Sequence, residues 1–186
     1  MRKSIAYCFL FVNLACNTSM EVRTEGNYEA LVLPDGSQVY LNHHSSISYQ
    51  EDFDPRTVNL SGEAFFFVKP NESIFTVATT HGDIEVLGTE FNVKTTSDQV
   101  AVDVKKGLVE LKTKYDRSKV KKGTKAVYKD GEQAVQKIKS NKEYLKWIRS
   151  LEKDFKALGK QLKPALREIG NDFKKAGKKI GDEFKN

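Results

Sequence analysis

The 186-residue sequence lacks a long hydrophobic run and contains only two cysteines. Its longest apolar stretch, residues 5–15, is too short to cross a bilayer as a helix, which needs about 20 residues. Two cysteines cannot build a disulfide framework. These absences exclude a multipass membrane protein and a small disulfide-stapled scaffold. The length fits one domain with an extension.

The first sixteen residues predict export. A basic start at Arg2 and Lys3 precedes the apolar residues 5–15, which lead to Cys16. This pattern resembles a bacterial lipoprotein signal, which implies that Cys16 becomes an acylated N-terminus and tethers the chain to a membrane face. An ordinary cleaved signal peptide and an uncleaved anchor remain alternatives. All three place the rest of the chain outside the cytoplasm.

The net charge of +6 arises at the two ends of the chain. Residues 142–186 contain thirteen basic and seven acidic side chains, and Arg2 and Lys3 add two more positive charges. The middle of the chain is therefore slightly acidic. Because nucleic-acid binding needs a basic face on a chain in the cytoplasm, we expect no nucleic-acid partner.

Residues 28–130 predict an all-β domain, with a linker before it at 17–27 and one after it at 131–141. Residues 31–41 hold two apolar runs around Pro34-Asp35-Gly36, where proline and glycine allow the chain to reverse in a hairpin. Turn signals recur about every 8 to 12 residues, which is typical of a sandwich, barrel or solenoid. Alternating apolar positions mark the strands: Val39/Leu41, Ile47/Tyr49, Val58/Leu60, Phe75/Val77, Ile84/Val86, Phe91/Val93 and Val100/Val102/Val104.

Two features interrupt the alternation. Residues 64–68 are apolar on both faces, which predicts a central strand covered on both sides. Gly88 lies inside a strand pattern and predicts a corner of the chain, as do Gly62 and Gly107. Residues 119–128 predict one further hairpin-like strand with basic outer positions.

Four motifs carry a family resemblance. The segments LPDGS (33–37), LSGEAFF (60–66), VLGTEFNV (86–93) and KGLVEL (106–111) resemble the FecR domain in order and spacing. The FecR domain is the periplasmic part of FecR-type regulators of iron uptake, and the resemblance implies an all-β domain with solenoid-like strands. The motif residues to which we assign a structural role are Asp35, Gly36, Gly62, Phe65, Phe66, Phe67, Gly88, Phe91 and Gly107.

Members of that family mostly receive a signal from an outer-membrane receptor loaded with an iron-siderophore complex. They pass it through one transmembrane helix to a cytoplasmic sigma factor. This sequence departs from the pattern, since it shows no sigma-binding segment, no spanning helix and no second periplasmic subdomain. We therefore expect a sensor or docking module with an envelope protein partner, without direct anti-sigma action in the cytoplasm.

The sequence indicates no catalytic residue, metal or cofactor. Adjacent strand residues such as His43 and His44 point to opposite faces and cannot both ligate one ion with His81. Ser45 beside His44 lacks an orienting acid and an oxyanion loop. For the carboxylates at positions 63 and 90, we favour strand-edge positions over a catalytic pair.

Residues 142–186 predict an amphipathic helix with a break near Pro164. Ser140 and Asn141 are candidate caps for its start. The motifs LGKQL, IGNDF and IGDEF recur every eleven residues, a period that keeps one apolar stripe nearly straight. We call this stripe the tail seam: Leu151, Phe155, Leu158, Leu162, Ile169, Phe173, Ile180 and Phe184.

The tail seam leaves three alternatives open. It can bind a partner helix, including a second copy, lie on a membrane surface, or fold back on the β domain. The sequence thus predicts an all-β FecR-like domain, solenoid-like or sandwich, with a C-terminal helical extension. Its expected function is non-enzymatic binding in the cell envelope, in signalling linked to iron or nutrient uptake. The alternative is a structural or surface-associating lipoprotein whose tail oligomerises or binds a membrane.

Overall fold

The computed structural model describes residues 18–150, which form two facing β-sheets and the start of a helix. Sheet A contains, in spatial order, β1 (Ser19–Arg23), β4 (Ser46–Gln50), β5 (Thr57–Ser61), β7 (Phe75–Thr79), β8 (Gly82–Val86), β11 (Leu108–Lys112) and β12 (Arg117–Lys121). Sheet B contains β14 (Gln136–Lys139), β13 (Thr124–Lys129), β10 (Gln99–Lys106), β9 (Glu90–Thr95), β6 (Glu63–Phe67), β3 (Gln38–Leu41) and β2 (Glu29–Val32). Residues 144–150 are helical.

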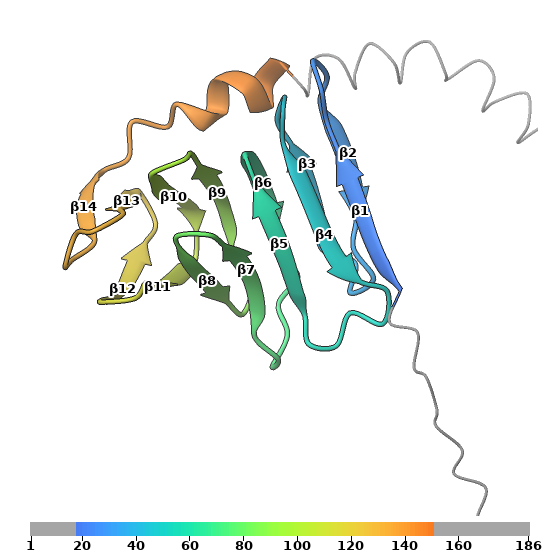
Figure 1. Ribbon diagram of the computed structural model, residues 1–186, viewed down its shortest axis with the longest axis horizontal. Coiled ribbons are helices and arrows are strands. Elements are labelled where there is room, and N and C mark those ends of the chain that lie inside the picture. The colour runs from blue at the N-terminus through green and yellow to red at the C-terminus, as the bar shows by residue number, and fades with distance from the viewer. Residues whose placement is uncertain (1–17, 151–186) are drawn as a thin grey trace, which may run out of the picture.

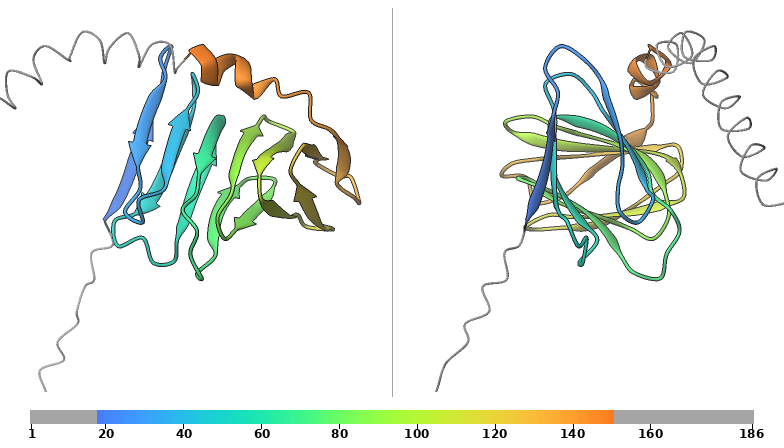
Figure 2. Two further views of the ribbon diagram at one scale, coloured as in Figure 1. Left: turned by 180° about the vertical axis from the view of Figure 1, so that it is seen from behind. Right: turned by 90° about the vertical axis from the view of Figure 1, so that its right-hand side faces the viewer.

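The strands succeed one another along the molecule, from β1 and β2 at one end to β12 and β14 at the other (Figure 1). Seen from its end, the molecule has two layers of strands with the helix outside them (Figure 2). Neighbouring strands are antiparallel, except that β5 and β7 run parallel. The chain crosses repeatedly between the sheets, so the domain is a sandwich built by a solenoid-like progression. The prediction of an all-β fold with a helical extension is confirmed.

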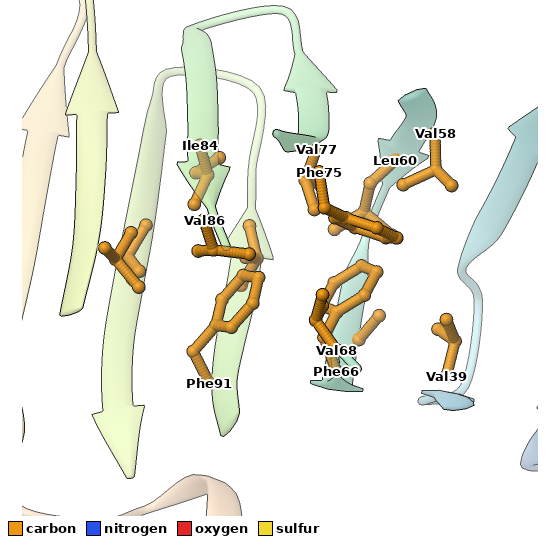
Figure 3. Close-up of a cluster of buried hydrophobic side chains, with 14 of the residues drawn as sticks. Val39, Val58, Leu60, Phe66, Val68, Phe75, Val77, Ile84, Val86 and Phe91 are labelled. Atoms are coloured by element: carbon orange, nitrogen blue, oxygen red, sulfur yellow. The ribbon is translucent and has the colours of Figure 1, made fainter. Parts of the chain in front are cut away.

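Alternating side chains fill the space between the sheets. The inward positions of the strands are apolar and buried, while their neighbours face outward, which is the pattern of a sheet with one dry face. Phe66 stacks on Phe91 at 5.2 Å between ring centroids and meets the edge of Phe75 at 6.1 Å. Figure 3 shows these three rings between the two layers, with valines on either side. The core is therefore centred on β6, β7 and β9.

The predicted hairpin at residues 33–37 joins β2 to β3. Gly36 has φ +78°, a conformation that favours glycine, and its N–H donates to the Leu33 carbonyl at 2.8 Å. Asp35 accepts hydrogen bonds from the backbone N–H and the hydroxyl of Ser37, both at 2.8 Å. It also pairs with buried Arg56 at 2.6 Å. This turn is thereby locked to the loop that enters β5.

Gly62 and Gly88 lie at two of the places where the chain passes from one sheet to the other. Gly62, between β5 and β6, has φ +92°, and a Cβ there would lie 2.5 Å from Ser45 Oγ. Gly88, between β8 and β9, has no positive φ, but its Cβ would lie 2.7 Å from the Cα of Pro70. The first corner needs glycine for its backbone angle and the second for close approach.

Three predictions, two linkers and one hairpin-like strand, differ from the structure. The linker expected at 17–27 contains β1, and the linker expected at 131–141 contains β14. Both are edge strands, whose side chains are mostly exposed, so their sequences lack the apolar alternation that marks buried strands. Residues 119–128 are no hairpin, because β12 pairs with β11 in sheet A whereas β13 pairs with β10 and β14 in sheet B.

Some predictions fall outside residues 18–150. Cys16 and every residue of the tail seam belong to this group, so lipidation and the use of the seam stay predictions. Within the described part of the chain, no helix has the length and apolar character that crossing a membrane requires.

Replacing Phe66 by alanine should destabilise the fold by about 3–5 kcal/mol, because the cavity between the sheets cannot close around the lost ring. Urea unfolding of the full chain measures the change. Val32→Ala, at an exposed edge position, should shift stability by less than about 0.5 kcal/mol. Equal losses for the two variants would contradict this description of the core.

Candidate functional site

The helix at residues 144–150 covers the part of the outer face of sheet B around Phe65. Because Phe66 points into the core, Phe65 points to the opposite face, where it is buried under the helix. The helical residues that cover it are spaced three and four positions apart, as one face of a helix requires. The buried cluster consists of Phe65, Tyr144, Trp147 and Ile148, with Tyr28, Tyr40, Phe67 and Leu145 packed around it. We call this group the helix-docking cluster.

Aromatic contacts define the geometry of the helix-docking cluster. Phe65 stacks on Tyr144 with 5.5 Å between centroids and 26° between planes, and Trp147 stacks on Tyr28 at 6.0 Å and 11°. The ammonium group of Lys105 lies over the rings of Phe65 and Phe67, at 5.6 and 5.2 Å from their centroids. Such pairs each contribute about 0.5–1.5 kcal/mol beyond their buried area. The helix is thus held by packing on a preformed aromatic surface.

Glu63 joins three strands to the helix. Its Oε1 accepts hydrogen bonds from Asn92 at 2.9 Å and from the indole N–H of Trp147 at 3.1 Å. Its Oε2 accepts one from Asn42 at 3.0 Å and lies 3.5 Å from Lys94 Nζ. The side chain is only 12% exposed. Burying a carboxylate costs free energy unless hydrogen bonds replace those it made with water. The helix supplies one of these hydrogen bonds to Glu63, through Trp147.

The strand-edge positions expected for the two carboxylates are wrong. Glu63 begins β6, an interior strand of sheet B, and pairs in register with Lys94. Glu90 lies at the other end of the same strand pair, opposite Phe67, and its carboxylate is 3.0 Å from Lys105 Nζ. The two acids therefore form no pair with each other.

A second polar contact fixes the segment before the helix. The Ser140 hydroxyl lies 2.7 and 2.9 Å from the two carboxylate oxygens of Asp103, to which it donates. Burial raises the pKa of Asp103, and the Ser140 hydrogen bond lowers it in part. Asn141 Oδ1 accepts the N–H of Glu143 at 3.3 Å just before the helix. Of the two predicted caps, Asn141 serves the helix start and Ser140 ties it to β10.

A cavity of about 160 Å³ remains between sheet B and the helix. Its lining includes Glu63, Asn92, Asp103, Tyr144 and Trp147. Asn92 Oδ1 is buried, and no hydrogen-bond partner for it exists among residues 18–150. Burial also raises the pKa of Tyr144 to about 12, with the charges of Asp103 and Glu90 adding to the shift. The space is polar and large enough for water or another small hydrogen-bond donor.

His43, His44 and His81, which the sequence analysis considered as metal ligands, do not lie together in one site. His43 contacts Tyr28 at the rim of the helix-docking cluster, with 4.0 Å between ring centroids. His44 is exposed, and Ser45 Oγ accepts the backbone N–H of Glu63 at 2.9 Å, so that serine stabilises a chain corner. No group of three or more metal-ligating side chains is found among residues 18–150.

His81 is buried in the turn between β7 and β8. Its Nδ1 lies 2.8 Å from Asp130 Oδ1, and its Nε2 lies 2.8 Å from the carbonyl oxygen of Thr96. Burial by itself would lower the pKa of His81, but these hydrogen bonds and the charges of Asp130 and Asp98 raise it above 6.5 overall. The ring therefore links three loops.

The sequence left open that the helix folds back on the β domain, but the residues of the helix-docking cluster were not predicted. The signals were present, since β6 is apolar on both faces and Tyr144, Trp147 and Ile148 share one helical face. The pairing joins residues about eighty positions apart, and neither pattern by itself identifies the other as its partner.

Known proteins resemble this chain in sequence and in fold. Residues 20–110, just under half of the chain, match the family described as FecR protein. This match lies within the two-sheet body and supports the resemblance inferred from the four motifs.

Two crystal structures of a candidate anti-sigma factor from Parabacteroides distasonis are similar to this chain. In each, sequence identity is 29%. One has a TM-score of 0.65 and covers 69% of this chain and 64% of that one, and the other has a TM-score of 0.62 and covers 66% and 61%. The chain thus spans less than two thirds of that protein. No curated protein matches it.

Replacing Tyr144 by alanine should release the helix without opening the core between the sheets. Trp147 is the sole tryptophan, so its fluorescence reports docking directly. We expect a red-shifted emission maximum in Tyr144→Ala, with the β-sheet circular dichroism unchanged. Lys146→Ala, on the exposed face of the helix, should keep the wild-type maximum. An unshifted Tyr144→Ala spectrum would contradict the docking.

Stability should depend on pH through His81. A group with a raised pKa in the folded state stabilises the fold fully below its unfolded value of about 6.5, and the effect is lost as pH rises through the folded pKa. Asp130→Asn removes one cause of the shift. We expect it to lower the urea midpoint more at pH 5.5 than at pH 8.5. Asp52→Asn, in the connection between β4 and β5, removes a carboxylate that does not act on His81 and should show no such difference.

Proposed function

We propose that the chain is a non-enzymatic binding and signal-relay module of the cell envelope, acting in FecR-type regulation linked to the uptake of iron or another nutrient. The observation that carries the proposal is the FecR match over residues 20–110. The 29% sequence identity to a candidate anti-sigma factor of similar fold supports it. Both comparisons point to regulation rather than to catalysis.

The helix-docking cluster supplies a physical basis for the relay. Its contacts divide between the two-sheet body and the helical residues 144–150, and helices in proteins gain most of their stability from packing. A partner that competes for Phe65, Phe67 or Tyr28 would displace Trp147 and break its hydrogen bond to Glu63. Binding at the body would thereby change the position of residue 150 and of the chain that follows it.

The location follows from the N-terminal sequence. A lipid on Cys16 would tether the body to a membrane face, and the partner would be an envelope receptor or regulator. The resemblance to FecR supports this compartment, since that domain works outside the cytoplasm. Direct contact with a cytoplasmic sigma factor is not part of the proposal.

The eleven-residue repeat favours one alternative. A lipoprotein of structural function would use the tail seam to oligomerise or to lie on an anionic membrane. In that case the β body would only be attached to the functional tail, and changes in the helix-docking cluster would have no effect on gene expression.

Transcript measurements in the source bacterium separate the two functions. We expect deletion of the gene to change transcript levels of an outer-membrane receptor operon when cells are shifted from iron-rich to iron-poor medium. Complementation with wild type should restore the response, whereas Tyr144→Ala should not.

Lys146→Ala is the matched control and should restore the response fully. Wild-type transcript levels in the deletion strain would contradict the signalling function. Loss of liposome flotation on removal of residues 142–186, combined with unchanged transcripts, would favour the structural alternative.

A further inference from the structure

Both sheets are open at the same two ends of the molecule. Among residues 18–150, β1 and β2 at one end pair with a neighbour on one side only, and β12 and β14 do the same at the other end (Figure 1). An edge strand presents a row of backbone N–H and C=O groups that can pair with another strand. All four residues of β14 and four of the five in β1 are exposed. Each end of the body therefore offers two strands for pairing.

The two ends carry opposite charge. Residues 18–60, which form the end with β1 and β2, contain seven acidic and two basic side chains. Residues 108–140, which form β11 to β14, contain ten basic and four acidic side chains. Among the edge strands, β2 carries Glu29, and β1 carries Glu21 together with Arg23, which lies 2.6 Å from the Glu21 carboxylate. The edge strands at the other end carry basic side chains alone: Arg117, Lys119, Lys121, Lys137 and Lys139.

Apolar side chains on the edges also match. Val32 on β2 is 66% exposed and Ile138 on β14 is 52% exposed. Both belong to the outer face of sheet B, since Val32 pairs with exposed Gln38 and Ile138 pairs with Lys125. In sheet A, Val22 and Val120 both pack toward the core. Joining the two ends would therefore place apolar beside apolar and acid beside base.

Strand directions permit this junction in both sheets at once. Following the pairings across sheet A, β12 runs opposite to β1, so a copy shifted along the molecule would meet it in an antiparallel pair. Across sheet B, β14 runs in the same direction as β2, which gives a parallel pair. Both kinds of ladder are stable.

We propose that the chain associates head to tail with a second copy, β12 and β14 of one molecule pairing with β1 and β2 of the next. Charged residues on an edge strand normally prevent pairing between like edges. Here they disfavour contact between two acidic or two basic ends and favour contact between unlike ends. Because the contact uses different surfaces on the two partners, it can continue into a linear array.

Charge reversal at either end tests the proposal on the full chain. Variant one carries Lys119→Glu, Lys137→Glu and Lys139→Glu, and variant two carries Glu21→Lys and Glu29→Lys. By sedimentation at low salt, we expect the wild type to exceed its monomer mass of 21.1 kDa as concentration rises. Each variant alone should remain monomeric, and an equimolar mixture of the two should associate again.

Two controls make the outcome specific. Lys146→Glu with Arg149→Glu alters charge on the exposed face of the helix and should leave association unchanged. Phe173→Glu disrupts the tail seam and should also leave it unchanged. A monomeric wild type, or variants that associate as the wild type does, would overturn the proposal. Loss of association in Phe173→Glu alone would assign it to the tail and overturn the proposal as well.

Discussion

Strand β6 is apolar on both of its faces, and this constraint organises the rest of the molecule. Phe66 needs cover from sheet A, and Phe65 needs cover from the opposite side. Sheet A supplies the first layer and the helix at residues 144–150 supplies the second. A large aromatic side chain gains up to about 3 kcal/mol by leaving water, so an uncovered Phe65 would be a costly exposed patch. The helix at residues 144–150 therefore packs on the two-sheet body as a third layer.

Glu63 makes that cover specific. Apolar contact alone would hold a helix at several angles, whereas the indole N–H of Trp147 meets the carboxylate in one position. The same carboxylate also bonds Asn42 and Asn92, so the ends of β3, β6 and β9 are fixed together with the helix. Removing the helix would leave a mostly buried charge with fewer partners, which opposes partial undocking.

The surfaces that result are suited to contact with other proteins. The helix-docking cluster connects the body to the chain beyond residue 150, and the two ends of the sandwich present open strands of opposite charge. The FecR match and the 29% identity to a candidate anti-sigma factor agree with such a use. A solenoid-like order of strands explains why the ends are open, because successive hairpins extend the sheets without closing them.

The sequence by itself determined the buried strands, the hairpin at residues 33–37 and the two-sided character of β6. These features follow from local alternation and from glycine geometry, which neighbouring residues already express. Only the tertiary structure decided that β1 and β14 join the sheets, that β12 and β13 separate, and that Glu63 meets Trp147. Edge strands and long-range hydrogen bonds leave no local pattern, because their partners come from distant parts of the chain.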